Sequence, residues 1–323
     1  MDRRAWIIGS LGLLAAPRST RAQPSKVYQL GLLSPASFTQ PGLLVEPLSE
    51  LGYVEGRNLK IYRQYAEGRL DRLPALAAEL VQRRVDAVLV FGSTALQAAH
   101  EATRTIPIII LVAGADPVEL GLIASLARPG GNVTGVTQGA ILAAKRLEVL
   151  HETVPRAMRI AMLAPPEVPE SLSARLQVQE AEESAKRLGV TLISVPAPSR
   201  DYEHAFQTMV AERAGALFVT ASPIFNADRT RIITLAARHR LPAIYQWPEH
   251  VREGGLMAYG PSLRALNRRV AAFLDRIFKG AAPATLPVEQ ATELVLALNL
   301  KTAKALGLAI PPAVLARADE VIQ

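Results

Sequence analysis

One stretch of the sequence, residues 107–137, narrows the possible folds more than any other. It reads PIIILVAGADPVELGLIASLARPGGNVTGVT and begins with an apolar run, 108–113, between a proline and a glycine. A short run of this kind is typical of a strand buried on both faces, as in the parallel sheet of an α/β protein. Gly114 then permits a tight turn. Asp116 followed by Pro117 has the pattern of a helix N-cap with a proline in the first helical turn.

The second half of the stretch predicts a helix and then another strand. Helical spacing relates four apolar residues, namely Leu120, Ile123, Ala124 and Ala127. Gly130-Gly131-Asn132 breaks the helix, and 133–136 resumes as a strand. Such a unit places its polar turn at the carboxyl end of a strand, where open α/β sheets bind ligands. Asp116 is therefore expected to cap its helix and is also a candidate ligand contact.

The remaining chain continues this alternation of strands and helices. Its 323 residues, half of them hydrophobic, have room for two domains with sizeable cores. A first series is predicted with strands at 27–34, 58–65 and 86–91 and helices at 41–51, 73–81 and 95–103. A second series is predicted with strands at 159–164, 190–195, 216–220, 242–246 and 256–259 and helices at 141–153, 171–188, 202–213, 227–239 and 262–279. The fold class is therefore α/β, with two doubly wound parallel-sheet lobes.

Residues 1–22 have the pattern of a cleavable signal peptide. A basic segment, Asp2-Arg3-Arg4, precedes an apolar segment at 5–16, and a small residue stands before the predicted cut at Ala22–Gln23. The apolar segment is well short of the roughly 20 residues that a membrane-spanning helix needs. The paired arginines also fit a twin-arginine signal, so the export route stays open between the two pathways.

Charge and cysteine content limit the partners of the exported protein. The formal net charge is +7, and cleavage after Ala22 would remove four arginines and one aspartate, so the mature excess is small. No basic block with interleaved aromatic residues occurs, which argues against nucleic-acid binding. The absence of cysteine excludes disulfides, thiolate metal sites and lipid attachment at a cysteine. We therefore expect a freely soluble periplasmic protein and not a lipoprotein.

Patterns that would indicate an enzyme are missing. The turn after the first predicted strand, 34–37, is Ser-Pro-Ala-Ser, not the glycine-rich phosphate turn of a dinucleotide-binding enzyme. The sequence has no P-loop and no G-x-S-x-G elbow. The five histidines form neither H-x-x-x-H nor H-E-x-x-H, so no zinc site is predicted. We accordingly predict no catalytic residue, no metal and no cofactor.

Polar residues at the carboxyl ends of predicted strands form a candidate ligand site instead. They are Ser34, Gly92, Ser93, Thr94, Asp116 and Thr137 in the first series, and Thr220, Ser222, Tyr245 and Tyr259 in the second. Backbone N–H groups at the helix starts after Ser93 and Asp116 suit a carboxylate, and the Asp116 side chain suits an ammonium group. Tyr245 or Trp247 could stack on an aromatic ligand. Each serine or threonine could equally serve only as a helix cap.

Three segments resemble a known family. They are DPVELGLIASLARPGGNVTGVT (116–137), GGLMAYGPSL (254–263), and LPVEQ (286–290) with LNLKTAKALGLAIPPAVLARADEVI (298–322). They are similar to the ABC-transporter substrate-binding proteins, a family that includes tryptophan/tyrosine-binding lipoproteins. The resemblance implies a type I periplasmic-binding-protein fold, in which two lobes joined by a hinge hold a small-molecule ligand. It also implies delivery of that ligand to an ABC permease in the inner membrane, and we expect the receptor to be a monomer.

Such a fold crosses between its lobes three times, which predicts the domain boundaries. Crossings are expected near 137–140, 257–261 and 282–288, where glycine and proline punctuate the sequence. The first lobe would then comprise 23–138 plus 261–283, and the second 139–260 plus 284–323.

The sequence departs from the family at one turn and leaves other functions open. Where family members commonly carry Asn-Pro, residues 164–167 read Ala-Pro-Pro-Glu. Either Glu167 replaces the missing amide, or the ligand is not an aromatic amino acid. A soluble ligand-sensing partner of a membrane sensor is an alternative function. A doubly wound enzyme is a weaker alternative, because no nucleophile or acid/base pair stands out.

Overall fold

The structure, a computed structural model, describes residues 26–37, 40–138, 142–164 and 171–323. The predicted signal peptide at 1–22 lies outside these residues, and so do the turn at 165–167 and part of the first predicted crossing. None of the helices in the described ranges has both the length and the apolar character that crossing a membrane requires.

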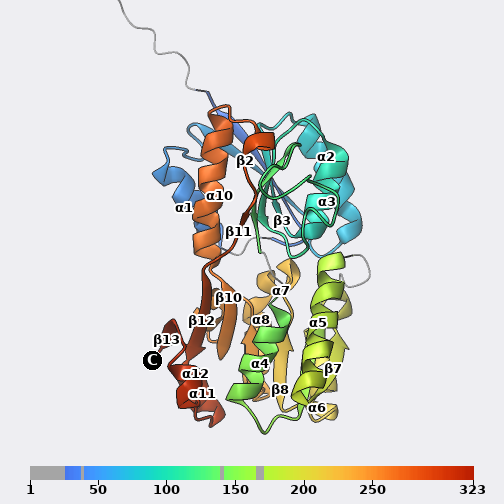
Figure 1. Cartoon of the computed structure of the whole chain (residues 1–323), viewed down its shortest axis with the longest axis vertical. Helices are drawn as coiled ribbons and strands as arrows, with labels where there is room; N and C mark the ends of the chain where they lie inside the picture. Colours follow the sequence, from blue (N-terminus) through green and yellow to red (C-terminus); the bar gives the residue numbers. More distant parts are fainter. Residues whose placement is uncertain (1–25, 38–39, 139–141, 165–170) are drawn as a thin grey trace, which may run out of the picture.

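The first lobe is built on a six-stranded sheet in the order β11-β5-β4-β3-β1-β2, with its recorded strand pairs all parallel. Its strands are β1 (Tyr28–Ser34), β2 (Leu59–Tyr65), β3 (Ala87–Phe91), β4 (Ile108–Val112), β5 (Val133–Thr137) and β11 (Glu289–Gln290). Its α-helices are α1 (Gly42–Glu50), α2 (Leu73–Gln82), α3 (Ser93–Ala102) and α10 (Leu263–Phe278). Figure 1 shows α1 and α10 on one side of this upper lobe and α2 and α3 on the other.

The second lobe is built on a seven-stranded sheet in the order β13-β12-β10-β9-β8-β6-β7. Its strands are β6 (Arg159–Ala164), β7 (Thr191–Pro196), β8 (Ala216–Val219), β9 (Ala243–Tyr245), β10 (Met257–Pro261), β12 (Leu294–Asn299) and β13 (Glu320–Ile322). Its α-helices are α4 (Ala143–Thr153), α5 (Leu172–Leu188), α6 (Tyr202–Ala211), α7 (Pro223–Ala227), α8 (Arg229–Arg238), α9 (Pro248–Arg252), α11 (Leu300–Leu306) and α12 (Pro312–Leu315). The pair β10–β12 is antiparallel, so this sheet is parallel only in part.

Apolar residues cover both faces of each sheet, as the buried runs of the sequence predict. One cluster joins the first sheet to α1 and α10, and a second joins it to α2 and α3. In the second lobe one cluster includes α6, α8 and α9, and another includes α4, α5, α11 and α12. β3 and β4 are buried at every position, because helices lie over both faces of their sheet. This arrangement confirms the predicted two-lobed α/β fold class.

The helix predicted after Asp116 does not form. Residues 117–121 make one isolated turn, in which the Leu120 N–H donates to the Asp116 carbonyl, and no α-helix follows. The cause is Gly121, whose φ of +68° is left-handed and ends the turn after one cycle. The Asp116 carboxylate accepts the Val118 N–H at 2.8 Å, so it closes a local turn and caps no helix.

Sheet membership revises one predicted crossing. β11 (Glu289–Gln290) pairs with β5 in the first sheet, and the chain enters the second sheet only at β12 (Leu294–Asn299). We therefore propose the third crossing at 291–293, not at 282–288. β10 belongs to the second sheet while α10 packs on the first, and we propose the second crossing near 261.

Candidate functional site

A small cavity of about 40 Å³ lies between the two lobes, at the carboxyl ends of β3 and β8. We call it the polar cavity. Its lining residues are Phe91, Gly92, Ser93, Thr94, Val112, Gly114 and Gln138 from the first lobe and its exit, and Ser171, Ser173, Ala174, Gln177, Ala221, Ser222, Pro223, Gln246 and Trp247 from the second. This volume is enough for a few water molecules, so a larger ligand enters only if the lobes separate.

The start of α3 forms the first-lobe wall of the polar cavity. Gly92 precedes the helix with φ +91°, a left-handed conformation that favours glycine, and no side chain caps the helix. The Ser93 hydroxyl is engaged elsewhere, because it accepts the Ala115 N–H at 3.2 Å. The first N–H groups of α3 therefore lack a capping side chain at a point where the helix dipole is positive.

Two helix starts form the opposite wall. α5 begins at the cavity, and its N-cap Ser171 accepts the Ala174 N–H at 3.4 Å. The short helix α7 begins at Pro223, and its N-cap Ser222 accepts the Ile224 N–H at 3.2 Å. Helix starts from both lobes thus meet at one cavity, which makes its walls electropositive.

A buried arginine lies behind this second wall. Arg146 of α4 is fully buried and donates to the Val219 carbonyl at 3.1 Å and to Gln177 Oε1 at 3.2 Å. Gln177 lines the cavity, and its Oε1 also accepts the Ala221 N–H at 2.8 Å. Burial lowers the pKa of Arg146 to about 10, so the guanidinium stays protonated at neutral pH. Its hydrogen bonds run to neutral acceptors, and the nearby carboxylate of Glu180 favours its charged form.

Two residues that line the cavity, Gln246 and Trp247, each have a buried polar atom without a hydrogen-bond partner. Gln246 donates through Nε2 to Gln138 Oε1 at 2.7 Å, but its own Oε1 is buried without a hydrogen-bond partner. Trp247 is only 3% exposed, and its indole Nε1 also has no partner. The Trp247 ring stacks on His250 with centroids 5.7 Å apart. Burial lowers the pKa of His250 to about 3, so this neighbouring ring is neutral.

The two lobes touch around the cavity. A Cβ atom added to Gly114 of the first lobe would lie 2.1 Å from Ser173 Oγ of the second, and one added to Gly92 would lie 3.0 Å from Pro223 Cγ. The Gln138–Gln246 hydrogen bond also connects the end of the first lobe to the second. The structure therefore shows a closed arrangement, with glycines at points where the opposite lobe approaches closely.

The structure brings four of the ten predicted site residues to the polar cavity, namely Gly92, Ser93, Thr94 and Ser222. Three others donate their buried hydroxyl groups to nearby backbone carbonyls. These hydrogen bonds run from Ser34 to Ala36, from Thr137 to Ala113 and from Thr220 to Leu163.

The last three predicted site residues also lie outside the cavity lining. Tyr245 is buried in the second-lobe core and stacks on His250 with centroids 5.1 Å apart. Tyr259 packs at the edge of the other second-lobe cluster. Asp116 closes the local turn described above.

Sequence reasoning missed most of the second-lobe wall. Ser171 and Ser173 belong to the start of α5, and Gln177 lies one turn further along the same face. A serine before a helix is a recognisable N-cap signal, and it could have identified Ser171. The sequence carried no comparable signal for Gln138 or Gln246, because single glutamines occur commonly on exposed surfaces.

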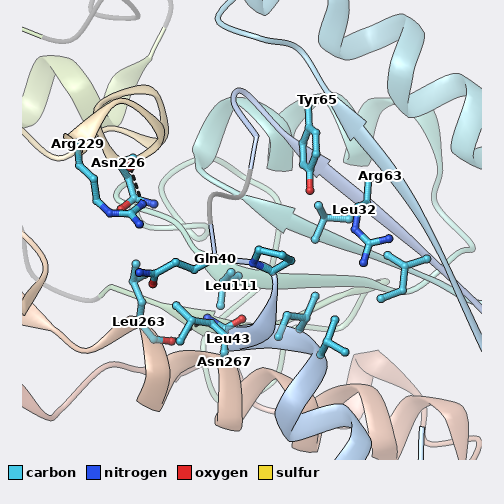
Figure 2. Close-up of a pocket in the computed structure, with 14 residues that line it drawn as sticks. Leu32, Gln40, Leu43, Arg63, Tyr65, Leu111, Asn226, Arg229, Leu263 and Asn267 are labelled. Atoms are coloured by element: carbon cyan, nitrogen blue, oxygen red, sulfur yellow. Dashed lines mark hydrogen bonds between the residues drawn. The ribbon is translucent and has the colours of Figure 1, made fainter. Parts of the chain in front are cut away.

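A second gap between the lobes, which we call the apolar pocket, has a volume of about 30 Å³. Its residues are Leu32, Gln40, Pro41, Leu43, Leu44, Val45, Ile61, Arg63, Tyr65, Leu111, Asn226, Arg229, Leu263 and Asn267. Figure 2 shows Asn226 and Arg229 on one side of the pocket and Arg63 and Tyr65 on the other. Both arginines are already paired, Arg63 with Glu55 and Arg229 with Glu253.

No cluster of three or more histidine, aspartate or glutamate side chains able to hold a metal ion occurs within the described ranges.

Known proteins resemble this chain over most of its length. A family model described as ABC transporter substrate binding protein matches residues 34–322. The tyrosine-binding protein of Clostridioides difficile is 26% identical over 265 residues, covering 82% of this chain and 75% of that protein.

Two solved structures share the fold closely. A conserved domain protein from Vibrio cholerae has a TM-score of 0.79 and 26% identity, covering 92% of this chain and 100% of that one. The ABC domain in complex with L-Trp from Streptococcus pneumoniae has a TM-score of 0.78 and 25% identity, with the same two coverages of 92% and 100%. These likenesses confirm the predicted type I periplasmic-binding-protein architecture.

Proposed function

The chain belongs to the family of ABC transporter substrate binding proteins, and we propose that it captures a small carboxylate solute between its lobes for import. Members of this family bind substrates and do not convert them, which confirms the prediction that the protein is not an enzyme. The proposed ligand is an amino acid or a related metabolite. The names of two relatives, a tyrosine-binding protein and a complex with L-Trp, support this class.

The observation that carries this proposal is the pair of unsatisfied polar atoms at the polar cavity. Gln246 Oε1 and Trp247 Nε1 are buried and have no hydrogen-bond partner. Leaving a buried polar atom unpaired costs about 1–3 kcal/mol. A ligand that bonds to both atoms recovers this cost, whereas a purely structural role would leave it unexplained.

The predicted site residues that line the cavity receive specific roles in this proposal. The N–H groups at the start of α3, around Ser93 and Thr94, would hold the ligand carboxylate. Gly92 keeps this approach open because it has no side chain. Ser222 would contact the ligand from the second lobe. The rings of Phe91 and Trp247 pack against each other with centroids 6.2 Å apart, and they would offer an apolar surface to the ligand body.

Ligand binding in this proposal shifts the protein between open and closed lobes. The first lobe would comprise 23–138 plus 261–290, and the second 139–260 plus 294–323, with the crossings as hinges. A solute in the cavity adds contacts that exist only when the lobes meet, so it favours the closed state. Small-angle scattering of the protein with and without a bound solute measures this change.

Delivery requires export and a membrane partner. We propose that cleavage after Ala22 releases a monomer into the periplasm and that the closed form docks on an ABC permease in the inner membrane. Mass spectrometry of the periplasmic fraction should find Gln23 at the N-terminus. An intact Met1 on cytoplasmic material alone would contradict this localisation.

Fluorescence gives a direct test of solute binding. The sequence contains two tryptophans, Trp6 and Trp247, so the predicted mature chain carries only the one at the cavity. Titration with a panel of amino acids, organic acids, sugars and nucleosides should change its emission for the true ligand class. The same ligand at a hundred times its Kd should stabilise the fold by about 2.7 kcal/mol. Flat emission and unchanged melting across the panel would refute solute capture.

A further inference from the structure

We infer that the polar cavity selects carboxylates whose second polar group is an uncharged hydrogen-bond donor, hydroxy acids above all, over the matching α-amino acids. The inference rests on the proposed function of this cavity and specifies its ligand chemistry. Four observations carry it: two helix starts, a buried cation, an unpaired donor and an unpaired acceptor.

The helix starts favour an anionic group in the cavity. α3 and α5 comprise 10 and 17 residues, and both begin among the lining residues, one from each lobe. Each contributes a partial positive charge at its N-terminus. Because α3 has no capping side chain, its first N–H groups are available to a carboxylate oxygen.

The buried guanidinium of Arg146 adds a full positive charge on the second-lobe side. It contacts Gln177, a lining residue, and it lies over the Phe218 ring at 5.0 Å. Its hydrogen bonds run to the neutral oxygens of Leu142, Val219 and Gln177. The carboxylate of Glu180 offsets part of this charge. The remaining positive charge attracts a carboxylate in the cavity and disfavours an ammonium group.

The unpaired donor completes the carboxylate site. Trp247 is only 3% exposed. Its Nε1–H can donate a hydrogen bond but cannot accept one. Since this donor has no partner in the protein, a carboxylate oxygen from the ligand satisfies it. This donor calls for an acceptor on the ligand, which the carboxylate attracted by the helix starts supplies.

The unpaired acceptor defines the second polar group of the ligand. Gln246 Oε1 is buried and partnerless, while Nε2 of the same side chain is held by Gln138. This oxygen accepts a hydrogen bond from a hydroxyl or amide group. Because it is neutral, it cannot balance the charge of an ammonium group. The lining residues that the structure describes are all uncharged, and Asp116 lies outside them. A buried ammonium would therefore keep its charge beside Arg146 with no carboxylate from these residues to balance it.

Matched ligands that share one side chain test the inference. We would titrate the mature protein by calorimetry at pH 7 with L-phenyllactate, 3-phenylpropanoate and L-phenylalanine, and with the lactate–propionate–alanine and indole-3-lactate–indole-3-propionate–tryptophan series. In the series that fits the cavity, the hydroxy acid should bind at least tenfold more tightly than the amino acid. Tighter binding of the amino acid would overturn the inference and leave solute capture intact. Binding of a sugar or nucleoside instead would overturn the carboxylate assignment as well.

Two glutamine variants distinguish the acceptor, Gln246, from the residue that holds it, Gln138. Gln246→Ala removes the unpaired oxygen and should abolish the advantage of the hydroxy acid over its deoxy analogue. Gln138→Ala breaks the same Gln138–Gln246 bond but keeps the Gln246 acceptor, so it should preserve that advantage. Trp247→Phe should weaken all three ligands of a series about equally, because each carries the carboxylate. An unchanged hydroxy-acid advantage in Gln246→Ala would refute the role of the acceptor.

Discussion

The polar cavity and the apolar pocket occupy the same boundary between the lobes, yet they differ in what remains unsatisfied. In the polar cavity, Gln246 and Trp247 each keep a buried polar atom without a partner. In the apolar pocket, the arginines are paired with glutamates, and Asn226 Oδ1 is the one lining atom recorded as unpaired among the described residues. The difference suggests a division of labour, in which leucine packing supplies stability and the polar cavity supplies ligand affinity.

The largest expected effect is on stability, from a leucine of the apolar pocket. Leu111 is fully buried and belongs to the cluster that joins the first sheet to α10. Leu111→Ala should lower the free energy of unfolding by about 2–5 kcal/mol, the usual cost of such a cavity. Ligand affinity should change less than threefold, because the residue does not line the polar cavity. Urea unfolding and calorimetry measure the two quantities.

Leu315→Ala is the matched control, since Leu315 is 38% exposed in the second lobe. It should change stability by less than about 1 kcal/mol, because surface substitutions away from special features have small effects. If Leu111→Ala weakened binding as strongly as it weakened the fold, the proposed division of labour would be wrong.

The next effect is on affinity, from the closest approach of the lobes. Gly114→Ala places a Cβ atom 2.1 Å from Ser173 Oγ, so the lobes cannot meet without moving that side chain. Rotation of the Ser173 hydroxyl still leaves its Cβ 3.3 Å from the new methyl group. Ligand binding should therefore weaken roughly three- to tenfold, because the closed state becomes less favourable. The stability of the ligand-free protein should hold, since an open form avoids the clash.

Adding Ser173→Gly to this variant removes the clashing hydroxyl and should recover most of the affinity. Scattering should show the single variant more extended than the wild type in the presence of ligand. A single variant that binds and closes like the wild type would mean that the contact between Gly114 and Ser173 is not part of ligand capture.

The fold was largely predictable from the sequence, because glycine and proline residues stand close to the ends of the predicted helices and strands. The runs that became β3 and β4 are short and bounded by turn residues, which favours strands over helices. Helices cover both faces of that sheet, so every position of these strands is buried. The helices and strands after residue 279 were not predicted from the sequence. A wrong prediction concerns the segment after Asp116, where four apolar residues keep helical spacing but Gly121 adopts a left-handed conformation. Periodicity alone could not predict that one glycine would override it.

The candidate site was harder to predict, because strand ends fix a position but not a side-chain direction. Tyr245 ends β9 with its ring in the second-lobe core, whereas the next two residues, Gln246 and Trp247, line the cavity. Strict alternation would place Tyr245 and Trp247 on the same side, but the strand ends at Tyr245, and Gln246 and Trp247 both reach the cavity. Which side faces the cavity depends on how the two lobes meet, and the local sequence does not contain that information.

A smaller effect is expected at the exposed edge between the two gaps. Gln40 Nε2 donates to Glu253 Oε1 at 3.0 Å, which connects the lobes beside the apolar pocket. Gln40→Ala should weaken ligand binding by about 0.5 kcal/mol, or two- to threefold, because exposed polar pairs contribute little. Glu253 keeps its ion pair with Arg229 in this variant, so the fold should be unaffected. A tenfold loss in calorimetry would show that this exposed contact, and not the polar cavity, dominates closure.

The smallest effect is expected at Asp116, the acidic residue that the sequence first suggested as a partner for a ligand ammonium group. Its carboxylate accepts the Val118 N–H at 2.8 Å and lies outside the lining of both gaps. Asp116→Asn keeps an oxygen for that hydrogen bond and removes the charge. The free energies of unfolding and of ligand binding should therefore both stay within about 0.5 kcal/mol of the wild type.

A different result at Asp116 would change the ligand assignment. If affinity fell by about 1.5–3 kcal/mol while the ligand-free protein kept its stability, the carboxylate would be bonding to a ligand cation. Calorimetric titration of Asp116→Asn with an amino acid and its hydroxy analogue distinguishes the cases, because only the amino acid carries the ammonium. A selective loss for the amino acid would bring Asp116 into the site when ligand is bound and would overturn the preference for uncharged donors. If the variant binds each of the two ligands as the wild type does, Gln246 and Trp247 remain the polar contacts that distinguish the cavity from the apolar pocket.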